Sequence, residues 1–471
     1  MLFNSIQFLV FFPVVTILYF LLPHAFRWAL LLTASCVFYM AYVPYYILIL
    51  AFTICVDYIS GISIENASGH RKKVFLIISL ISNIGILSYF KYFNFLNDNL
   101  IALGHLIQQP IGFRHLSILL PIGLSFHTFQ AMSYNIEVYR GHQKAERHFG
   151  LFSLYVMFYP QLVAGPIERP QNLLHQFREK HIFKYEEVAD GLKLMLWGFF
   201  KKIVVADRLA NYVDEVYNHP GAYHGLPVVI ATIFFAFQIY CDFSGYSDIA
   251  IGAAQVMGFR LMDNFNRPYF SASISEFWRR WHISLSTWFR DYFYISIGGN
   301  RVSIPRWYFN LFLTFLVSGL WHGANWTFII WGALNGVYIV LEIIIKPITL
   351  KFPKLINFRV LNVLITFILI DFAWIFFRAS SVQNAVILIR NMFVFSNGGL
   401  KWALFDTYDF WICVISILFM EWVHYMERHN KMRHFFNDRP LIVRWAMYTF
   451  LVWAIWIYGV FGAREFIYFV F

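Results

Sequence analysis

The sequence predicts an all-α polytopic membrane protein, and three observations support this fold class. Hydrophobic residues make up 59% of the 471 positions and charged residues only 13%, whereas a soluble domain has about 25% charged residues. The mean hydropathy is high, at +0.57. The apolar runs are interrupted by Gly, Pro or charge at helical lengths, and not at the roughly ten-residue alternation of an outer-membrane barrel.

Thirteen apolar runs are long enough to cross or enter a bilayer as helices. They cover residues 6–22, 28–42, 46–60, 74–93, 116–136, 151–164, 192–205, 226–240, 308–322, 326–345, 360–377, 408–424 and 441–461. Because some runs are short, we expect about 11–13 transmembrane or re-entrant helices. The first run lacks a basic flank and a small-residue cleavage site, so it is predicted to be retained. No linker or repeat interrupts the chain, so one membrane domain over residues 1–471 is expected.

Lys and Arg gather in loops at 71–73, 140–147, 346–359 and 428–444. The positive-inside rule places these loops in the cytoplasm. Three predicted helices precede the first loop and one follows the last, so both termini are expected outside. Such a topology needs an even number of crossings, which predicts that at least one run is re-entrant. The net charge of +11 then reflects topology and attraction to anionic lipid, and it does not indicate nucleic-acid binding.

The sequence offers no pattern for a bound cofactor or metal. The four cysteines lie in apolar runs without CxxC spacing, which argues against a disulfide framework or a structural zinc site. No HxxxH or HExxH spacing suggests a catalytic zinc. No Walker or dinucleotide fingerprint is present, so ATP hydrolysis and nicotinamide chemistry find no support.

His322 is the residue that most strongly indicates a function. It lies in the segment SGLWHGAN, residues 318–325, between two apolar runs. An ionisable side chain at bilayer depth is costly and often marks a pathway or a reaction centre. Gly319 and Gly323 could let a backbone or a slim substrate approach the imidazole. The alternative is a histidine satisfied between packed helices, with the glycines serving as interhelical contacts.

Residues 276–294 (EFWRRWHISLSTWFRDYFY) are too charged to cross a membrane but are strongly amphipathic. One continuous helix would gather a largely aromatic face within about 100°: Phe277, Trp281, Ser284, Leu285, Trp288 and Tyr292. Its opposite side would carry Arg279, His282, Ser286 and Arg290. The pattern predicts a helix at the membrane interface. It is either a brace with snorkelling arginines or, as we favour, a helix whose His282 and arginines face a polar cavity for an anionic substrate.

Other polar groups lie in or beside apolar runs. Asp242 and Asp248 need partners, and we expect them to pair with arginines, to hold a histidine tautomer, or both. For His127 and Asp371, a scaffolding role is favoured over direct chemistry.

Several motifs together resemble the membrane-bound O-acyltransferases, and within them the bacterial branch that modifies polysaccharides such as alginate. They are residues 276–301 and 318–326, with SFHTFQAMSYNIEVYRG (125–141), YPQLVAGPIER (159–169), 242–265 and WIFFRA (374–379). The resemblance extends from the N-terminal MLFNS to the C-terminal FIYFVF. Two local departures are Ser296, where proline is common, and Asn335, where some relatives have histidine.

The resemblance implies a ring of helices around a thin central reaction chamber. It implies that His322 is the catalytic base and that His282, the second motif histidine, donates a hydrogen bond to the carbonyl oxygen or orients the donor. Arg279 and Arg290 are then expected to bind the substrate, as are Trp321 and Asn325 beside His322.

The expected reaction is transfer of an acetyl group from cytoplasmic acetyl-CoA, a substrate and not a bound cofactor, to hydroxyls of an extracytoplasmic polysaccharide. The resemblance also implies a bacterial cytoplasmic-membrane location and a separate SGNH-type partner that completes transfer to the sugar. The alternative is a transporter of a polysaccharide or lipid-linked saccharide, although no halves of matching hydropathy are evident.

Overall fold

A computed structural model describes residues 1–109, 111–117, 121, 123–163, 165–349, 358–394, 407–426, 439–462 and 464–469. Within these residues the secondary structure is helical, without a strand, which confirms the all-α fold class. Each of the thirteen predicted apolar runs contains helix. The chain divides into two compact units, Met1–Val188 with Ala253–Met262 (unit 1), and Ala189–Gly252 with Asp263–Phe471 (unit 2). The prediction of a single domain stays a prediction.

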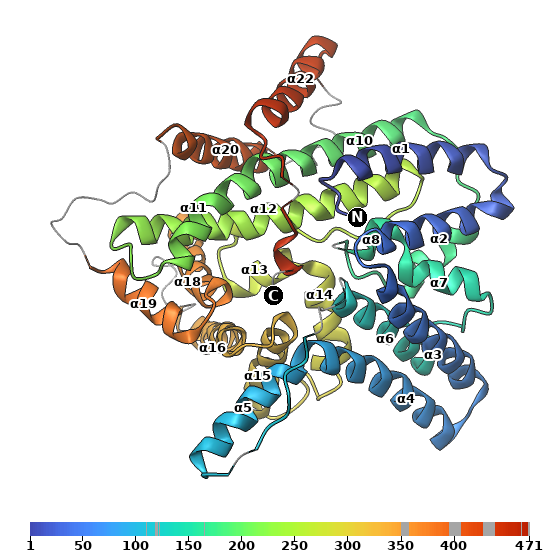
Figure 1. The fold of residues 1–471 in the computed structure, drawn as a ribbon, viewed down its shortest axis with the longest axis horizontal. Helices are drawn as coiled ribbons and strands as arrows, with labels where there is room; N and C mark the ends of the chain where they lie inside the picture. Colours follow the sequence, from blue (N-terminus) through green and yellow to red (C-terminus); the bar gives the residue numbers. More distant parts are fainter. Residues whose placement is uncertain are drawn as a thin grey trace. The chain divides into compact units, whose positions relative to one another are not determined.

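Unit 1 contains α1 (Ile6–Leu21), α2 (His24–Met40), α3 (Ile47–Asn66), α4 (Gly69–Leu87), α5 (Phe93–Leu106), α6 (Leu124–Arg140), α7 (Phe149–Met157), α8 (Tyr159–Leu162) and α9 (Pro170–Leu173). Unit 2 contains α11 (Asp207–Asn218), α13 (Ile274–Arg280), α14 (Ile283–Trp288), α15 (Ile304–His322), α16 (Trp326–Thr349), α18 (Arg359–Arg378), α19 (Val382–Met392), α20 (Thr407–Met426) and α22 (Leu441–Tyr458). Two helices, α10 (Tyr185–Phe199) and α12 (Leu226–Val256), include residues of both units (Figure 1).

Seven helical stretches among the described residues are long and apolar enough to cross a bilayer. They are Pro44–Asn66, Gly69–Leu106, Leu226–Val256, Trp326–Pro347, Arg359–Arg378, Thr407–Met426 and Leu441–Tyr458. Many of their large apolar side chains are exposed, as expected for surfaces that face lipid. The protein is therefore a multi-pass membrane protein. Other predicted runs form shorter or interrupted helices, so the number of crossings and the orientation stay predictions.

A buried carboxylate ties three helices of unit 1 together. Asp57 on α3 accepts hydrogen bonds from the Ser79 hydroxyl at 2.6 Å and from the Asn83 amide at 2.9 Å, both on α4. The Asn135 amide on α6 donates to the same carboxylate at 2.9 Å. A carboxylate buried without such donors would be strongly destabilising, so these bonds determine how α3, α4 and α6 pack.

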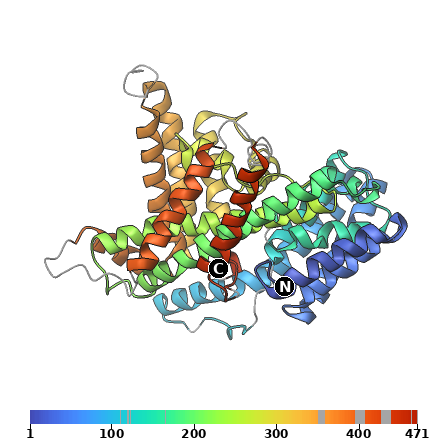
Figure 2. The same cartoon turned by 90° about the horizontal axis from the view of Figure 1, so that it is seen from above.

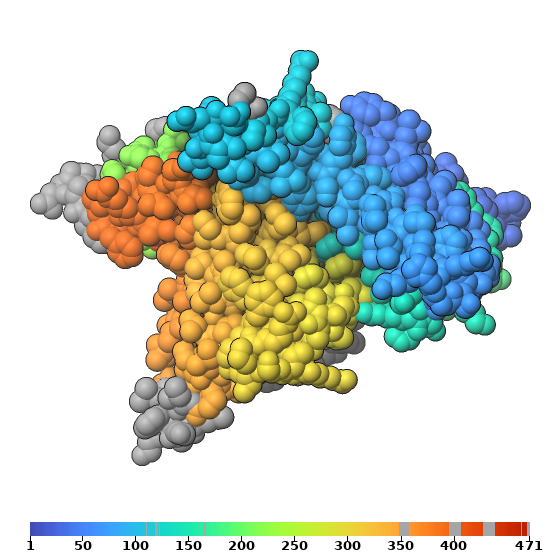
Figure 3. Space-filling view, turned by 90° about the horizontal axis from the view of Figure 1, so that it is seen from below, coloured from blue at the N-terminus to red at the C-terminus, as the bar shows by residue number. Residues whose placement is uncertain are grey.

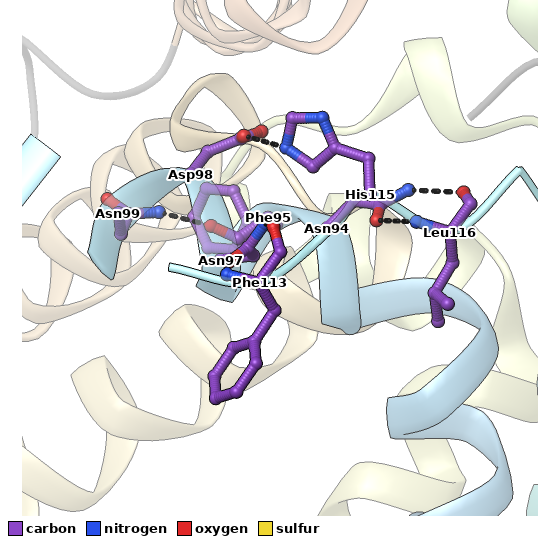
Figure 4. A network of polar contacts seen from close by, with 8 residues as sticks. All are labelled: Asn94, Phe95, Asn97, Asp98, Asn99, Phe113, His115 and Leu116. Carbon is purple, nitrogen blue, oxygen red and sulfur yellow. Dashed lines mark hydrogen bonds and ion pairs between the residues drawn. The ribbon is translucent and has the colours of Figure 1, made fainter. Parts of the chain in front are cut away.

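Two asparagines of α5 hold the segment that follows this helix (Figure 4). The Asn94 amide exchanges two hydrogen bonds, each 2.9 Å long, with the backbone of Leu116. The Asn97 amide does the same with Phe113, at 2.7 and 2.6 Å. A side-chain amide has one acceptor and two donors, so it can pair with a backbone peptide group as a neighbouring strand would.

In unit 2, α15 and α16 pack side by side (Figures 1 and 2), and their residues are part of the yellow-orange surface of Figure 3. A Cβ atom on Gly319 would lie 2.3 Å from the Phe328 carbonyl oxygen and 3.1 Å from the Cα of Gly332. A Cβ on Gly323 would lie 2.1 Å from the Phe328 ring. These two glycines therefore serve as interhelical contacts. Of the two interpretations of Gly319 and Gly323, this is the one in which they allow helices to pack closely.

Candidate active site

The predicted amphipathic helix is broken at His282, which corrects the expectation of one continuous helix. α13 ends at Arg280, α14 begins at Ile283, and a π-helical segment follows over Phe289–Tyr294. His282 lies between them in the left-handed region, with φ of 43° and ψ of 55°. The predicted apolar face is nevertheless buried at all six positions: Phe277, Trp281, Ser284, Leu285, Trp288 and Tyr292. Its periodicity therefore identified the buried side correctly.

Asn264 holds His282 in place. The Nδ1 atom of His282 lies 3.1 Å from the Oδ1 atom of Asn264. The same oxygen accepts hydrogen bonds from the backbone N–H of Ser284 at 3.3 Å and from its hydroxyl at 2.9 Å. The backbone carbonyl of Asn264 also accepts from the N–H of Ile283 at 2.9 Å. His282 is only 1% exposed, and burial lowers the pKa of its imidazole to about 3.

His322 ends α15 and is buried among aromatic rings. Its ring centroid lies 4.9 Å from that of Trp321 and 5.0 Å from that of Trp331. Phe377 and Tyr468 contact the imidazole at 5.3 and 5.6 Å. The histidine is therefore held by packing on several sides, which restricts the rotation of its ring.

The two motif histidines belong to one aromatic cluster within unit 2. Trp321 contacts both imidazoles, with centroids 6.4 Å from His282 and 4.9 Å from His322. A second connection passes through Phe243, which lies 4.5 Å from His282 and 4.8 Å from Tyr468. The fold therefore brings together two residues that are separated by 40 positions in the sequence.

A cavity of about 520 Å³ lies beside this cluster, within the usual range for small-molecule sites. Its lining includes Arg279, Ser286 and Arg290 from the predicted polar side of residues 276–294, and Ser318 from α15. His282 and His322 do not line it. Trp278 lines the cavity and contacts Trp331, which in turn contacts His322. Aromatic side chains thus lie between the arginines and the imidazole of His322.

The two arginines differ in their charge environment. Arg290 forms an ion pair with Asp291 at 2.7 Å, and the neighbouring Arg280 pairs with Glu276 at 2.6 Å. No ion pair with a described residue involves Arg279, which is exposed. Arg279 is therefore the cavity-lining cation with the most charge available for an anionic ligand.

Asn325 stabilises the start of α16, in addition to its predicted contact with substrate. Its Oδ1 atom accepts a hydrogen bond from the N–H of Thr327 at 3.0 Å, so it caps the start of α16. Its amide nitrogen donates to the carbonyl of Ser380 at 3.2 Å. The predicted roles of Arg279, Arg290 and Asn325 in substrate binding stay predictions, as does that of Trp321.

Asp242 and Asp248 pair with lysines and not with arginines, which corrects the expectation for both. Lys202 bridges Asp207 at 2.8 Å and Asp242 at 2.6 Å, and Lys201 pairs with Asp248 at 2.6 Å. Asp242 also accepts a hydrogen bond from the backbone N–H of Ile467, at 2.8 Å. This ion network anchors the C-terminal segment that carries Tyr468.

His127 and Asp371 contact groups other than the two motif histidines. His127 is buried in α6 of unit 1, where its ring contacts Tyr39. Asp371 in α18 accepts a hydrogen bond from the Thr232 hydroxyl at 3.0 Å. Within the described part of the chain, no three His, Cys, Asp or Glu side chains converge to hold a metal ion.

Sequence reasoning missed Asn264, Trp331 and Tyr468 as neighbours of the motif histidines. Asn264 lies within residues 242–265 and Tyr468 within the C-terminal FIYFVF, two segments of the family resemblance. The resemblance could therefore have marked these two as candidates. Only the fold shows what each of them contacts.

Comparison with known proteins identifies the family. The profile of MBOAT, the membrane-bound O-acyltransferase family, matches residues 140–383. A probable alginate O-acetylase AlgI of Pseudomonas aeruginosa is 42% identical over 403 residues, which cover 84% of this chain and 75% of that protein. A peptidoglycan O-acetyltransferase of Helicobacter pylori is 36% identical over 391 residues, 77% of this chain and 73% of that protein.

A more distant relative is a teichoic acid D-alanyltransferase of Bacillus subtilis, 28% identical over 281 residues, 56% of this chain and 70% of that protein. The matched family and the alginate and peptidoglycan relatives are acyltransferases. This decides against the transporter alternative. The chain belongs to the membrane-bound O-acyltransferase family and is an O-acetyltransferase.

Proposed function

We propose that this chain passes acetyl groups from cytoplasmic acetyl-CoA toward hydroxyls of an extracytoplasmic polysaccharide, such as alginate, in a bacterial cytoplasmic membrane. The observation that carries the proposal is the joining of His282 and His322 in one buried aromatic cluster, beside a cavity lined by two arginines. Two relatives, a probable alginate O-acetylase and a peptidoglycan O-acetyltransferase, support the acetyl group and the polysaccharide acceptor.

His322 acts as general base in this proposal. The acceptor hydroxyl attacks the thioester carbonyl, its proton moves to the imidazole, and the carbon–sulfur bond breaks to release CoA. The proton then passes from the imidazole to the CoA thiolate. A positioned base typically accelerates such a step by about 10²–10⁴-fold. The aromatic rings around His322 keep water away and hold the imidazole in one orientation.

The cavity supplies the donor site. Guanidinium groups form charge-assisted hydrogen bonds with phosphates, and Arg279 and Arg290 both line the cavity. The lining residue Ser318 stands one turn before His322 on α15. A donor held by the arginines would therefore have its reactive end near the turn of α15 that carries the base. Movement of the Trp278 and Trp331 side chains would open the way to His322.

A separate extracytoplasmic partner of the SGNH type would complete the transfer to the polymer. The test uses inside-out membrane vesicles that contain the full chain, acetyl-CoA labelled in the acetyl group, and alginate enclosed in the vesicles. We expect label to reach the alginate only when both the chain and the partner are present. Vesicles in which the chain leaves the label entirely in acetyl-CoA, with the partner present, would contradict the proposal.

A further inference from the structure

The tautomer of His282 can be read from its hydrogen-bond partner. The backbone N–H of Ser284 can only donate, and the side-chain atom of Asn264 that it meets at 3.3 Å must therefore be the oxygen. This contact removes the usual ambiguity between the oxygen and nitrogen of an asparagine amide. The Nδ1 atom of His282 lies 3.1 Å from that same oxygen. Two acceptors do not form a hydrogen bond, so Nδ1 carries the proton.

We propose that Asn264 is a positioning residue that fixes His282 as the tautomer protonated at Nδ1, so that Nε2 carries the lone pair. This inference rests on the proposed function for its catalytic meaning. A neutral imidazole has one donor and one acceptor nitrogen, so Nε2 accepts a hydrogen bond from a substrate hydroxyl and does not donate one to the thioester carbonyl. Of the two roles that the family resemblance implies for His282, donation to the carbonyl oxygen is thereby set aside.

Burial supports a neutral imidazole at His282. Both Asn264 and His282 are 1% exposed, and burial lowers the pKa of His282 to about 3. The rings around the imidazole are apolar: Phe243 at 4.5 Å, and Phe265 and Trp321 at 6.4 Å. The Asn264 contact would not balance the charge of an imidazolium there, because it comes from an uncharged amide.

The amide nitrogen of Asn264 is itself held, since it donates to the Ser247 hydroxyl at 3.3 Å. Ser247 belongs to α12 and Ser284 to α14. The carboxamide therefore has partners on two helices, and a rotation that offered its nitrogen to His282 would break both contacts. This is the arrangement by which an outer partner selects the tautomer of a functional histidine.

The first test reads the tautomer directly and does not depend on activity. The full chain, labelled with ¹⁵N-histidine, is reconstituted in liposomes, and the imidazole nitrogens are observed by solid-state NMR. The signal that disappears in His282→Gln is assigned to His282. We expect a protonated Nδ1 and an unprotonated Nε2 in the wild type, and a mixture of tautomers in Asn264→Leu. A wild-type signal with the proton on Nε2 would overturn the inference, whatever the enzyme acetylates.

The second test uses acetyl transfer from labelled acetyl-CoA to alginate in vesicles that contain the partner. Loss of an outer partner of a functional histidine typically costs about 10- to 100-fold, and we expect a rate loss of this size in Asn264→Leu. Asn391→Leu is the matched control, because it removes another buried amide, bonded to the Pro220 carbonyl at 2.9 Å. Equal rate losses per folded molecule in the two variants would show a structural role and overturn the inference.

Asn264→Asp separates tautomer control from folding. Its carboxylate keeps an acceptor at Nδ1 and raises the pKa of the imidazole, so His282 becomes charged and Nε2 becomes a donor at low pH. The rate should then recover as the pH rises past this new pKa, and the acidic limb should lie at higher pH than in the wild type. Ionisable groups along the adjoining elements, Asp242, Asp263 and His322, are unchanged in the variant. An unshifted pH profile would overturn the inference.

Discussion

Replacement of His322 by glutamine should remove activity without removing the protein. Glutamine is close to histidine in volume and carries polar atoms, but it cannot accept a proton near neutral pH. The rate of acetyl transfer should fall by at least about 100-fold, the lower range for a positioned base. That loss corresponds to about 2.7 kcal/mol of activation free energy, because each tenfold change is 1.36 kcal/mol.

The packing around His322 determines which substitution gives a clear answer. The imidazole contacts four aromatic rings and is 4% exposed. Truncation to alanine would leave a cavity, and truncation of a large buried side chain to alanine costs about 2–5 kcal/mol of folding stability. A volume-conserving change usually costs less than about 1.5 kcal/mol. His322→Gln is therefore the more informative variant, and His322→Ala should also lower the abundance of the protein.

Gly319→Ala is the matched control for packing. Its new Cβ atom would meet the Phe328 carbonyl oxygen at 2.3 Å, so α15 and α16 would have to separate. We expect this variant to lose abundance in the membrane while the remaining molecules keep most of their specific activity. The assay measures both quantities, by immunoblot of the membrane fraction and by labelled acetyl transfer. If His322→Gln is as abundant as the wild type and its specific activity falls less than about tenfold, the general-base role is refuted.

Three further predictions concern the donor, pH and topology. Arg279→Ala should raise the KM for acetyl-CoA by about tenfold or more, because a hydrogen bond to a charged group contributes about 1.5–3 kcal/mol. Arg390→Ala, which changes an exposed arginine outside the cavity lining, should leave the KM unchanged. Equal KM values in the two variants would contradict donor binding. Burial raises the pKa of Glu168 to about 7. The contribution of Glu168 to folding stability should therefore be fully present below about pH 4.5 and decline as the pH rises through 7. Thermal unfolding measured against pH should show this decline, and Glu168→Gln should remove it. In a variant without native cysteines, a cysteine placed within residues 69–73 should resist an impermeant thiol reagent in intact cells, and labelling there would reverse the orientation.

Hydropathy alone was sufficient for the fold class. Each predicted apolar run contains helix. A segment in lipid must satisfy its own peptide groups, and a helix does so within a single segment. Periodicity also identified the buried face of residues 276–294, since all six predicted apolar positions are buried. Hydropathy and periodicity both depend on residues that are close together in the chain, so both can be predicted from one sequence.

The break at His282 could not be predicted in this way. The residues around it, Trp281 and Ile283, are compatible with a helix, and neither glycine nor proline marks the position. The hydrogen bonds that stabilise the break come from Asn264, 18 positions earlier. The predicted partners of Asp242 and Asp248 were wrong for the same reason. Lys202 lies 40 positions before Asp242 and Lys201 lies 47 positions before Asp248, in a segment that was expected to be a simple span.

The backbone at His282 connects these observations to function. A non-glycine residue in the left-handed region costs about 1–2 kcal/mol, and the four hydrogen bonds that Asn264 accepts from residues 282–284 can offset that cost. In an unbroken helix, His282 would point with Arg279 and Ser286 toward the cavity, where it would be hydrated. The break instead directs it into the aromatic cluster with Trp321, where burial keeps it neutral. Strain at this one residue thus separates the cation that meets the donor from the histidine that must remain uncharged.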